Sequence, residues 1–321
     1  MKAISAERLA LRVTEVQAEA RDVMLLELRA VEGGMLPAFE PGAHLEIELP
    51  NGLIRHYSLT NDWRERDRYV IGVGRASHGR GGSEFLHRSV RCGLPLTSSV
   101  PRNNFPLDPG AASYLFIAGG IGVTPILSMI RWCEAQGRSW RLVYAARNGQ
   151  RAAFYETLRE FGARVHFHFD DQARGVLDVR RWLADERSGE HVYCCGPQAL
   201  MQAVQSQALN RPAQNVHFEY FAAPDAAAPS TCAGAFRIDL RRTGKSLPVP
   251  ADRSILEVLE ANGIAVPFSC REGMCGTCET AVCQGEIEHR DHVLSQDQRA
   301  AGKSMLVCVS RARSPVLVLD L

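Results

Sequence analysis

Four cysteines near the C-terminal end of the sequence constrain its fold more than any other feature. Cys270, Cys275 and Cys278 follow the spacing C-x4-C-x2-C, and Cys308 stands alone after a long gap. This is the ligand spacing of a plant-type 2Fe–2S cluster, whose two irons are held by four thiolates. Glycines between the first three cysteines allow a tight loop whose backbone N–H groups can point at the cluster. The pattern therefore predicts an iron–sulfur site.

A structural zinc site with four cysteine ligands is the alternative. Zinc sites usually draw their ligands from two closely spaced pairs, and Cys308 has no cysteine beside it. The spacing therefore favours the iron–sulfur cluster. Such a cluster has a low potential, about −400 mV, and it would transfer electrons one at a time.

Length, composition and charge describe a globular chain of two or three domains. The 321 residues are 45% hydrophobic and 23% charged, and the formal net charge is +1. This charge gives no reason to expect nucleic-acid or anionic-membrane binding. No segment reads as a signal peptide or a membrane span, and a reducing compartment suits the remaining cysteines as thiols. We therefore expect a cytoplasmic monomer.

The pattern of predicted secondary structure changes twice along the chain, which predicts a multidomain fold. Short strands separated by Gly and Pro, then strands alternating with helices, indicate an antiparallel β-barrel followed by an α/β domain with a parallel sheet. A Pro- and Ala-rich stretch then reads as a linker before a small α+β module. The expected boundaries are 1–108 for the barrel, 109–222 for the α/β domain, 223–231 for the linker and 232–321 for the module.

The expected elements follow the hydrophobic pattern. The barrel strands are expected at 9–16, 23–29, 44–49, 57–60 and 69–73. The α/β domain is expected to contain strands at 114–118, 140–145, 165–169 and 191–194 and helices at 124–136, 152–161, 178–185 and 197–208. In the module, Ser254 is the expected N-cap of a short helix.

A glycine-rich turn lies between a strand and a helix of the α/β domain. Gly119, Gly120 and Gly122 precede Thr124 and Pro125, and Pro is favoured in the first turn of a helix. Such a turn lets a dinucleotide backbone approach the helix N-terminus, whose dipole favours a pyrophosphate. Alone, the turn could be a tight strand-to-helix corner.

A second loop supports the nucleotide interpretation. Cys195, Gly196 and Pro197 follow the last predicted strand of the same domain and open another helix. In doubly wound sheets ligands bind at the carboxyl ends of the strands. Both loops can therefore line one crevice, and we expect a nicotinamide nucleotide there.

The barrel segment holds two further candidates. Arg55 could pair with a phosphate and Tyr57 could offer its flat face to a ring, although an ordinary surface strand would look the same. Further on, Gly81, Gly82 and Ser83 precede a helical stretch. They read either as a second anion cradle with Ser83 as N-cap or as a flexible loop.

Taken together, the whole chain resembles the phthalate dioxygenase reductase family, a branch of the ferredoxin–NADP⁺ reductase superfamily. The resemblance rests on the flavin motif at Arg55–Leu59, the nicotinamide motifs at Gly119–Pro125 and Cys195–Pro197, and the C-terminal cysteines. It implies a flavin barrel, then a nucleotide domain, then a plant-type ferredoxin domain of the β-grasp kind.

The resemblance also implies the cofactors and their residues. It implies FMN, with its phosphate held by Arg55 and the 81–83 loop, and NADH as the donor. Thr124 and Cys195 would lie near the contact between flavin and nicotinamide, and Phe221 would cover the flavin ring. The residues expected to bind FMN or NADH are Arg55, His56, Tyr57, Ser58, Val73, Gly81, Gly82, Ser83, Gly119, Gly120, Gly122, Thr124, Pro125, Arg147, Cys195, Gly196, Pro197 and Phe221.

At two places the sequence leaves the transfer of the family pattern open. The family commonly has a small residue after the motif arginine, where this chain has His56, so the polarity beside the flavin is open. Arg147 and Arg151 lie in one loop and could meet a 2′-phosphate, so the resemblance favours NADH without excluding NADPH.

The function implied is a reductase that splits two-electron into one-electron transfer. NADH would reduce FMN, and electrons would pass singly to the 2Fe–2S cluster and on to another protein. The sequence has no C-x-H paired with C-x2-H, so it lacks a Rieske centre. We therefore expect the acceptor to be a separate Rieske-type oxygenase acting on an aromatic compound. An electron-transfer subunit of a dehydrogenase and a non-catalytic zinc module are the alternatives.

Overall fold

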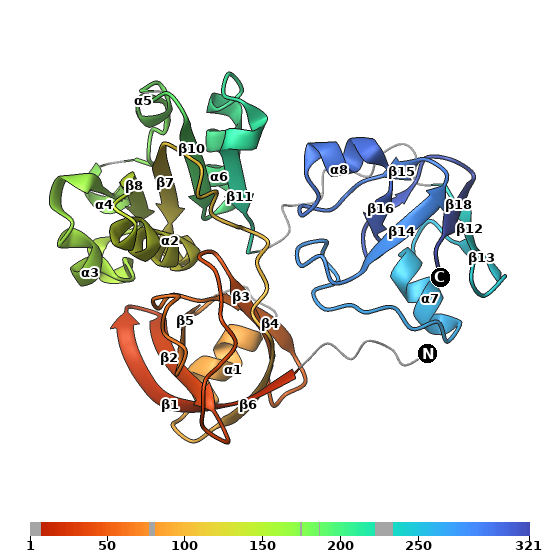
Figure 1. Cartoon of the computed structure of the whole chain (residues 1–321), viewed down its shortest axis with the longest axis horizontal. Helices are drawn as coiled ribbons and strands as arrows, with labels where there is room; N and C mark the ends of the chain where they lie inside the picture. Colours follow the sequence, from red (N-terminus) through yellow and green to blue (C-terminus); the bar gives the residue numbers. More distant parts are fainter. Residues whose placement is uncertain (1–7, 77–80, 174, 186, 222–233) are drawn as a thin grey trace. The chain divides into compact units, whose positions relative to one another are not determined.

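The computed structural model describes residues 8–76, 81–173, 175–185, 187–221 and 234–321. The chain forms two compact units, Met1–Glu219 and Tyr220–Leu321 (Figure 1). The expected linker, 223–231, lies outside the described residues. Among the residues that are described, no helix combines the length and apolarity that a membrane crossing requires.

The first unit begins with an antiparallel barrel, as predicted. Its six strands are hydrogen-bonded in the order β4-β3-β6-β1-β2-β5. The edge strands meet where Leu59 bridges to Ile71 and the Thr60 N–H donates to the Val70 carbonyl at 2.9 Å, so the sheet closes on itself. The strands are β1 (Arg8–Ala20), β2 (Val23–Ala30), β3 (His44–Glu48), β4 (Ile54–Ser58), β5 (Tyr69–Gly74) and β6 (Pro95–Ser99).

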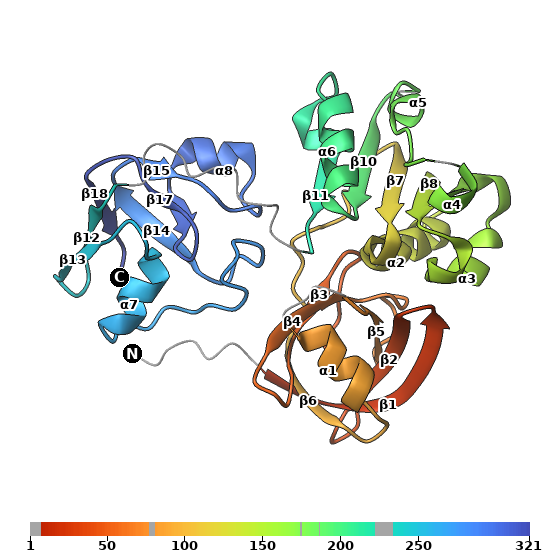
Figure 2. The same cartoon turned by 180° about the vertical axis from the view of Figure 1, so that it is seen from behind.

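Helix α1 (Gly82–Ser89) belongs to the barrel and packs on its core through Leu86, which is buried (Figure 2). Strand β6 was not among the expected elements. Its sequence, Pro-Leu-Thr-Ser-Ser, carries no strong strand propensity. It becomes a strand because β1 and β3 both pair with it.

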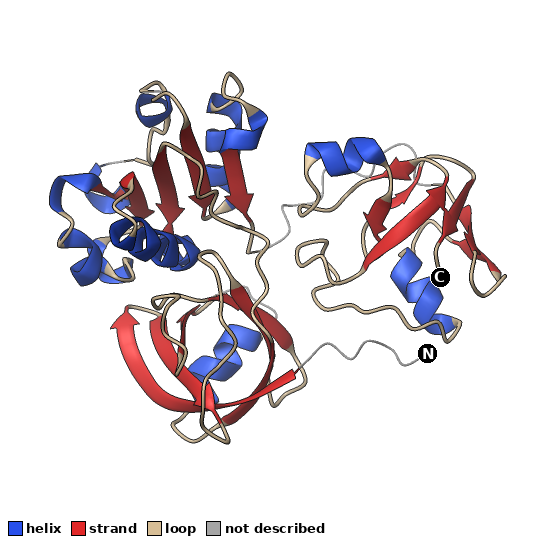
Figure 3. Ribbon diagram, viewed as in Figure 1, coloured by secondary structure: helices blue, strands red, loops and turns tan. Residues whose placement is uncertain are grey.

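A parallel five-stranded sheet follows in the same unit, also as predicted. The order is β11-β10-β7-β8-β9, and every neighbouring pair is parallel. The strands are β7 (Ser113–Gly119), β8 (Ser139–Ala146), β9 (Val165–Phe169), β10 (Glu190–Cys195) and β11 (Val216–Glu219). The helices are α2 (Val123–Ala135), α3 (Tyr155–Arg159), α4 (Asp170–Ala173), α5 (Arg180–Leu183) and α6 (Gln198–Gln207) (Figure 3).

Two of these helices are shorter than expected. The stretch 152–161 yields only α3, because Phe154 takes a left-handed φ of 59° immediately before it. The stretch 178–185 yields only α5, because the Asp178 carboxylate accepts the Arg180 N–H and the helix begins there. Both departures arise from single residues that a hydrophobic pattern does not resolve.

The second unit is a small α+β fold. Its main sheet has the order β13-β12-β18-β14-β16, in which β12 and β18 are parallel, and β15 pairs with β17. Ser254 caps its helix as expected, within a capping box completed by Glu257. The elements are β12 (Phe236–Leu240), β13 (Ser246–Val249), α7 (Ile255–Ala261), β14 (Glu279–Gln284), β15 (Ile287–Glu288), α8 (Gln296–Ala301), β16 (Ser304–Leu306), β17 (Arg311–Ala312) and β18 (Val316–Leu319).

Within the first unit, two glycines of β5 bring the barrel against the start of α2. A Cβ atom on Gly72 would lie 2.8 Å from the Thr124 methyl group, and one on Gly74 would lie 3.2 Å from the Ile121 side chain. Glycine inside a strand often marks such a close approach of another backbone. The barrel therefore abuts the glycine-rich turn that precedes α2.

Candidate functional site

The two loops expected to bind the nucleotide meet at the carboxyl ends of neighbouring strands β7 and β10. A methyl group on Gly122 would lie 2.3 Å from the carbonyl oxygen of Cys195, and one on Gly119 would lie 2.5 Å from Pro197 Cδ. A Cβ atom on Gly196 would lie 2.9 Å from the Gly119 Cα. Only glycine fits at these positions. We call this contact of the 119–122 and 195–197 loops the glycine crossing.

A tyrosine hydroxyl donates a hydrogen bond to the turn of the glycine crossing. Gly120 has a φ of +52°, and its carbonyl accepts a hydrogen bond from the buried Tyr144 hydroxyl at 3.1 Å. Helix α2 then starts at Val123, with Pro125 in its first turn as expected. The Thr124 hydroxyl donates to the Ile121 carbonyl at 2.9 Å, and Thr124 is 2% exposed. The turn is therefore rigid before any ligand binds.

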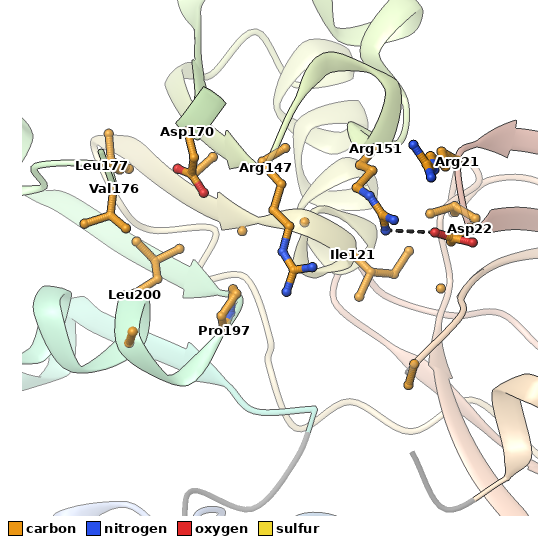
Figure 4. Close-up of a pocket in the computed structure, with 18 of the residues that line it drawn as sticks. Arg21, Asp22, Ile121, Arg147, Arg151, Asp170, Val176, Leu177, Pro197 and Leu200 are labelled. Atoms are coloured by element: carbon orange, nitrogen blue, oxygen red, sulfur yellow. Dashed lines mark ion pairs between the residues drawn. The ribbon is translucent and has the colours of Figure 1, made fainter. Parts of the chain in front are cut away.

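A cavity of about 510 Å³ opens beside the glycine crossing (Figure 4). This volume is typical of small-molecule and cofactor sites. Its walls come from the crossing, from the β1–β2 turn and the end of β5, and from the segments after β8 and β9. Val176, Leu177 and Leu200 line one end of the cavity, with Asp170 beside them, and Arg147 and Arg151 lie toward the other end (Figure 4). This lining suits a nucleotide with a flat base and a pyrophosphate.

The two arginines that sequence reasoning considered for a 2′-phosphate have different surroundings. Figure 4 shows Arg147 extending into the cavity. Arg151 is instead paired with Asp22 of the barrel at 2.8 Å. Asp170, at the end of β9, faces the same cavity and was not predicted. The signal that could have found it is its position directly after a strand of a parallel sheet.

The predicted flavin strand and the 81–83 loop lie together. The Arg55 side chain crosses the first residue of α1 so closely that a Cβ atom on Gly82 would lie 2.5 Å from its Nε atom. Arg55 also donates to the Ile54 carbonyl at 2.7 Å. A guanidinium beside a helix N-terminus is a suitable cradle for a phosphate. The residues present thus fit the phosphate end of a flavin.

The expected role of Ser83 as N-cap is wrong. The helix begins one residue earlier, and Gly81 is the capping residue, with a φ of 79° that favours glycine. The Ser83 hydroxyl instead accepts the N–H of Ala76 at 3.2 Å. It therefore joins α1 to the residues after β5 and does not cap the helix.

The end of β4 presents buried polar groups that suit a polar ring. Ser58 is 3% exposed, and its hydroxyl has no partner among the described residues. Burial raises the pKa of the half-buried Tyr57 to about 12, although Arg55 opposes the shift. A buried hydroxyl without a partner costs free energy, so a bound flavin would satisfy it. Val73 differs, because its side chain is fully buried in the barrel core.

His56 lies against a second histidine. Its ring stacks on that of His44 at 5.2 Å with an angle of 24° between the planes. Burial lowers the pKa of His44 to about 3, with smaller contributions from the charges of His56 and Arg102. His44 is therefore neutral at physiological pH. The polarity beside the flavin strand comes from this pair of rings.

The carboxyl end of β11 adds a residue that the sequence reasoning missed. Glu219 lies next to Cys195 in the parallel register of β10 and β11. Burial raises the pKa of the Glu219 carboxyl to about 8, and its Oε2 atom has no partner among the described residues. Burial also raises the pKa of the Cys195 thiol, and the Glu219 charge adds to this. Phe221 is the second residue of the second unit and is 48% exposed.

The four cysteines expected to hold the cluster form two hydrogen-bonded pairs. The bond from Cys270 is the main cause that lowers the pKa of Cys275, and the bond from Cys308 does the same for Cys278. The Cys270 sulfur also accepts the backbone N–H groups of Glu272 and Met274, at 3.3 and 3.4 Å. Two pairs of thiols with amides directed at sulfur suit a cluster in which each of two irons takes two ligands.

A single zinc ion fits this arrangement less well. Within the described residues, no three His, Cys, Asp or Glu side chains converge closely enough to hold one metal ion. Gly273 and Gly276 have φ values of +69° and +72°, so the loop turns as the sequence analysis expected. Next to the loop, Arg271 lies 4.2 Å from the Phe268 ring centroid and pairs with Glu260 at 2.7 Å.

Two family models match parts of the chain. The model of the 2Fe–2S iron–sulfur cluster binding domain matches residues 238–313, which include all four cysteines. The model of the dimethylamine monooxygenase subunit DmmA-like N-terminal domain matches residues 95–215. The first match agrees with the iron–sulfur interpretation and not with a zinc module.

Relatives of known activity align along nearly the whole chain. Phthalate dioxygenase reductase of Burkholderia cepacia is 45% identical over 98% of this chain and 97% of its own length. Phenoxybenzoate dioxygenase subunit beta of Ectopseudomonas oleovorans is 44% identical over 97% of each chain. A solved structure of phthalate dioxygenase reductase, described as modular for electron transfer from pyridine nucleotides to 2Fe–2S, covers 98% of both chains at 45% identity with a TM-score of 0.72.

Proposed function

The chain belongs to the phthalate dioxygenase reductase family, and we propose that its own residues perform that family's electron transfer as follows. It is the reductase component of an oxygenase system, an oxidoreductase that binds FMN, NADH and a 2Fe–2S cluster. The observation that carries the assignment of the site is the glycine crossing. It brings the 119–122 and 195–197 loops together, and the close approach of Gly72 to Thr124 and of Gly74 to Ile121 supports a site beside the barrel.

FMN is assigned to the barrel face next to α1. Arg55 and the backbone of Gly81–Ser83 bind its phosphate, and Tyr57 and Ser58 contact its ring. The direct contact between Arg55 and Gly82 supports the first assignment, and the unpartnered Ser58 hydroxyl supports the second. His56 acts through its stack on His44. Val73 contributes backbone shape, since its side chain belongs to the core.

NADH is assigned to the cavity beside the glycine crossing. Gly119, Gly120 and Gly122 allow the pyrophosphate to approach the start of α2, and Arg147 supplies a positive charge. Asp170 disfavours a 2′-phosphate, because it places a carboxylate in the same cavity. Arg151 is already paired with Asp22, which leaves it less able to bind that group. Both features support NADH over NADPH.

When bound, FMN would supply the conversion of two-electron transfer from the nucleotide into one-electron transfer to the cluster. The chain's residues orient the reactants for this step. Thr124 and Cys195 would shape the wall where nicotinamide meets flavin, and Glu219 would offer a neutral carboxyl there. Phe221 would cover the flavin ring. The burial of Cys195 and Glu219 supports a dry contact. A dry contact protects the reduced centre from water and solutes.

The cluster is assigned to Cys270, Cys275, Cys278 and Cys308. Their pairing in twos supports this set. We also propose that the chain is organised as a flavin barrel over 1–108, a nucleotide domain over 109–222 and a ferredoxin domain over 232–321, joined by the linker 223–231. The separation of the second unit near residue 220 supports the last boundary.

The acceptor is proposed to be a separate Rieske-type oxygenase that acts on an aromatic compound. The dioxygenase reductases among the relatives support this class. Arg271 and Glu272 belong to the Cys270–Cys278 loop itself, and Phe268, which is 36% exposed, contacts Arg271 just before that loop. Electron-transfer complexes use small interfaces, below about 1,200 Å². Charge at such a rim mainly tunes the association rate.

The protein is further proposed to be a cytoplasmic monomer. The nine cysteines that the structure describes are all free of disulfides, which supports a reducing compartment. Size-exclusion chromatography with light scattering tests the monomer. A dimer at micromolar concentration would contradict it.

Stopped-flow mixing of the purified holoprotein with NADH tests the assignment as a whole. Flavin absorbance is expected to bleach first, and the electron paramagnetic resonance signal of a reduced 2Fe–2S cluster is expected to follow. Reversal of charge in Glu272→Lys should then slow delivery to the cognate oxygenase, whereas Arg237→Glu, an exposed reversal in the same unit, serves as the control. A protein without flavin absorbance, or equal slowing by both variants, would contradict the corresponding part.

A further inference from the structure

The tip of the β1–β2 hairpin binds the segment that follows β8. The Arg21 N–H donates to the Gln150 carbonyl at 2.7 Å, and the Asp22 carboxylate pairs with Arg151 at 2.8 Å. The Glu19 carboxylate accepts the N–H of Phe154 at 2.6 Å. The first partner in each contact belongs to the barrel, and the second belongs to the α/β part of the same unit. We call these three contacts the hairpin latch.

Phe154 shows that the latch holds an unfavourable conformation. It is the only non-glycine residue besides Asp22 and Arg271 with a positive φ among the described residues. A bulky residue in the left-handed region carries steric strain and persists only where its surroundings enforce it. The ring is buried in the core, and the N–H is taken by the barrel carboxylate. The conformation of the 148–154 segment thus depends on Glu19.

A line of hydrogen bonds leads from the latch to the glycine crossing. The backbone N–H of Ala153, next to Phe154, faces the Tyr144 hydroxyl and acts to lower its pKa. That hydroxyl donates to the Gly120 carbonyl at 3.1 Å. Burial raises the pKa of the Tyr144 hydroxyl, so it stays protonated and able to donate. The barrel carboxylate is thereby connected to the turn proposed to hold the nucleotide.

We propose that Glu19 and Asp22 are positioning residues that set the place of the nicotinamide relative to the flavin, acting through Phe154, Ala153 and Tyr144 on the Gly120 turn. The inference rests on the proposed function, because it takes FMN to lie on the barrel and NADH at the glycine crossing. Hydride transfer depends steeply on the distance and angle between the reacting atoms. The hairpin latch joins the barrel, which would hold FMN, to the α/β part, which would hold NADH. It would therefore control the rate of hydride transfer without contacting the reacting atoms.

The first test compares the FMN-loaded wild-type chain with the double variant that carries Glu19→Ala and Asp22→Asn. Stopped-flow bleaching of FMN by NADH should slow about tenfold in the double variant. The dissociation constant for NADH should change less than about threefold, and the FMN affinity should stay unchanged. The charge-transfer absorbance between reduced flavin and NAD⁺, which reports the stacking of the two rings, should weaken in proportion to the rate.

Three variants separate positioning from a general loss of structure. Glu19→Gln keeps an oxygen that accepts the Phe154 N–H and should restore most of the rate. Tyr144→Phe removes only the hydroxyl between Ala153 and Gly120, so it should slow the same step even if Glu19→Ala does not fold. Glu156→Gln breaks an exposed ion pair with Arg159 inside α3 and is the matched control.

A double-mutant cycle tests the connection itself. Residues in one network give non-additive effects, so Glu19→Ala and Tyr144→Phe together should slow transfer little more than either alone. Additive slowing, or a double latch variant that transfers hydride within twofold of the wild type, would overturn the inference. Failure of NADH to bleach flavin in the wild type would instead contradict the proposed function.

Discussion

Gly119 and Gly122 of the glycine crossing and Gly276 of the Cys270–Cys278 loop, called the cluster loop, are needed for different reasons. In the crossing, Gly119 and Gly122 have φ values of −124° and −63°, which any residue can adopt. They are required because a Cβ atom would strike the opposite loop. In the cluster loop, Gly276 has a φ of +72°, and a Cβ atom there would meet only an ordinary contact at 3.5 Å from Val293.

This difference teaches how to interpret a glycine motif. A glycine that is required because a Cβ atom would clash marks a place where two backbones, or a backbone and a ligand, are in contact. A glycine that is required because its φ is positive marks a place where the chain turns. The first kind supports a binding crevice made by two separate segments. The second kind supports a single loop folded around a compact centre.

The largest effect should come from breaking the cluster loop alone. Cys308→Ser removes one of four proposed ligands and should abolish one-electron output to cytochrome c or to the oxygenase. NADH oxidation with ferricyanide should persist, because that activity needs only the flavin unit. Activity with both acceptors and the visible spectrum give the measurement. Equal loss of both activities would show that the two units are not independent.

Next in size is the change of a glycine in the crossing. Gly122→Ala places a methyl group 2.3 Å from the Cys195 carbonyl oxygen, so the loops must separate. A displacement of about 1 Å can cost about 100-fold in rate, and NADH-dependent reduction of FMN should fall by that order. Steady-state and stopped-flow rates with NADH give the measurement.

Gly120→Ala is the control for that comparison. It has a φ of +52° with open space around its Cβ position, so it should pay only the strain of about 1–2 kcal/mol that a left-handed residue carries. Similar losses of rate in both variants would contradict the distinction between closeness and backbone angle.

A smaller effect is expected at the flavin phosphate. Arg55→Ala removes a charge-assisted contact of about 1.5–3 kcal/mol, which is about tenfold or more in FMN affinity. Dialysis followed by titration with FMN, monitored by absorbance, gives the measurement. Arg88→Gln, on the same helix α1 but 70% exposed and paired with Glu84, is the control. If the two variants retain FMN equally, the phosphate lies elsewhere.

The smallest effect concerns the pH dependence of stability that the buried Glu219 carboxyl causes. The pKa of Glu219 is raised to about 8 in the folded chain from an ordinary value of 4.5. Its stabilising contribution is therefore complete below about pH 4.5 and is lost as the pH rises through 8. Glu219→Gln should melt a few degrees higher than the wild type at pH 8.5 and equally at pH 5. Calorimetry at both values gives the measurement, and parallel melting curves would contradict the assignment.

Sequence reasoning predicts a site most directly where the chemistry of a ligand imposes a spacing on the residues. The four cysteines, the Gly119–Pro125 turn and the Arg55 strand each have a local pattern that a ligand dictates. The class of each domain followed from periodicity, and the parallel sheet and barrel are as predicted.

What the sequence did not reveal depends on contacts between distant segments. Glu219 acquires its raised pKa from burial beside Cys195, and Asp22 acquires its partner Arg151 across the unit. Phe154 looks like an ordinary helical residue until the barrel carboxylate fixes it. A signal did exist in Gly72 and Gly74, because alternate glycines in a strand indicate that something must approach closely.

The pairing of β12 with β18 has a consequence for how the ferredoxin unit is made. These strands stand at opposite ends of that unit in sequence but are parallel neighbours at the centre of its sheet. Contacts between such distant segments form late and slowly. Until they form, the cysteines between them are exposed thiols that oxidants can convert to sulfenic acids or disulfides. Closure of the sheet therefore competes with oxidation of the thiols while the iron is loaded. Cells short of reductant should accumulate a yellow protein that lacks its iron.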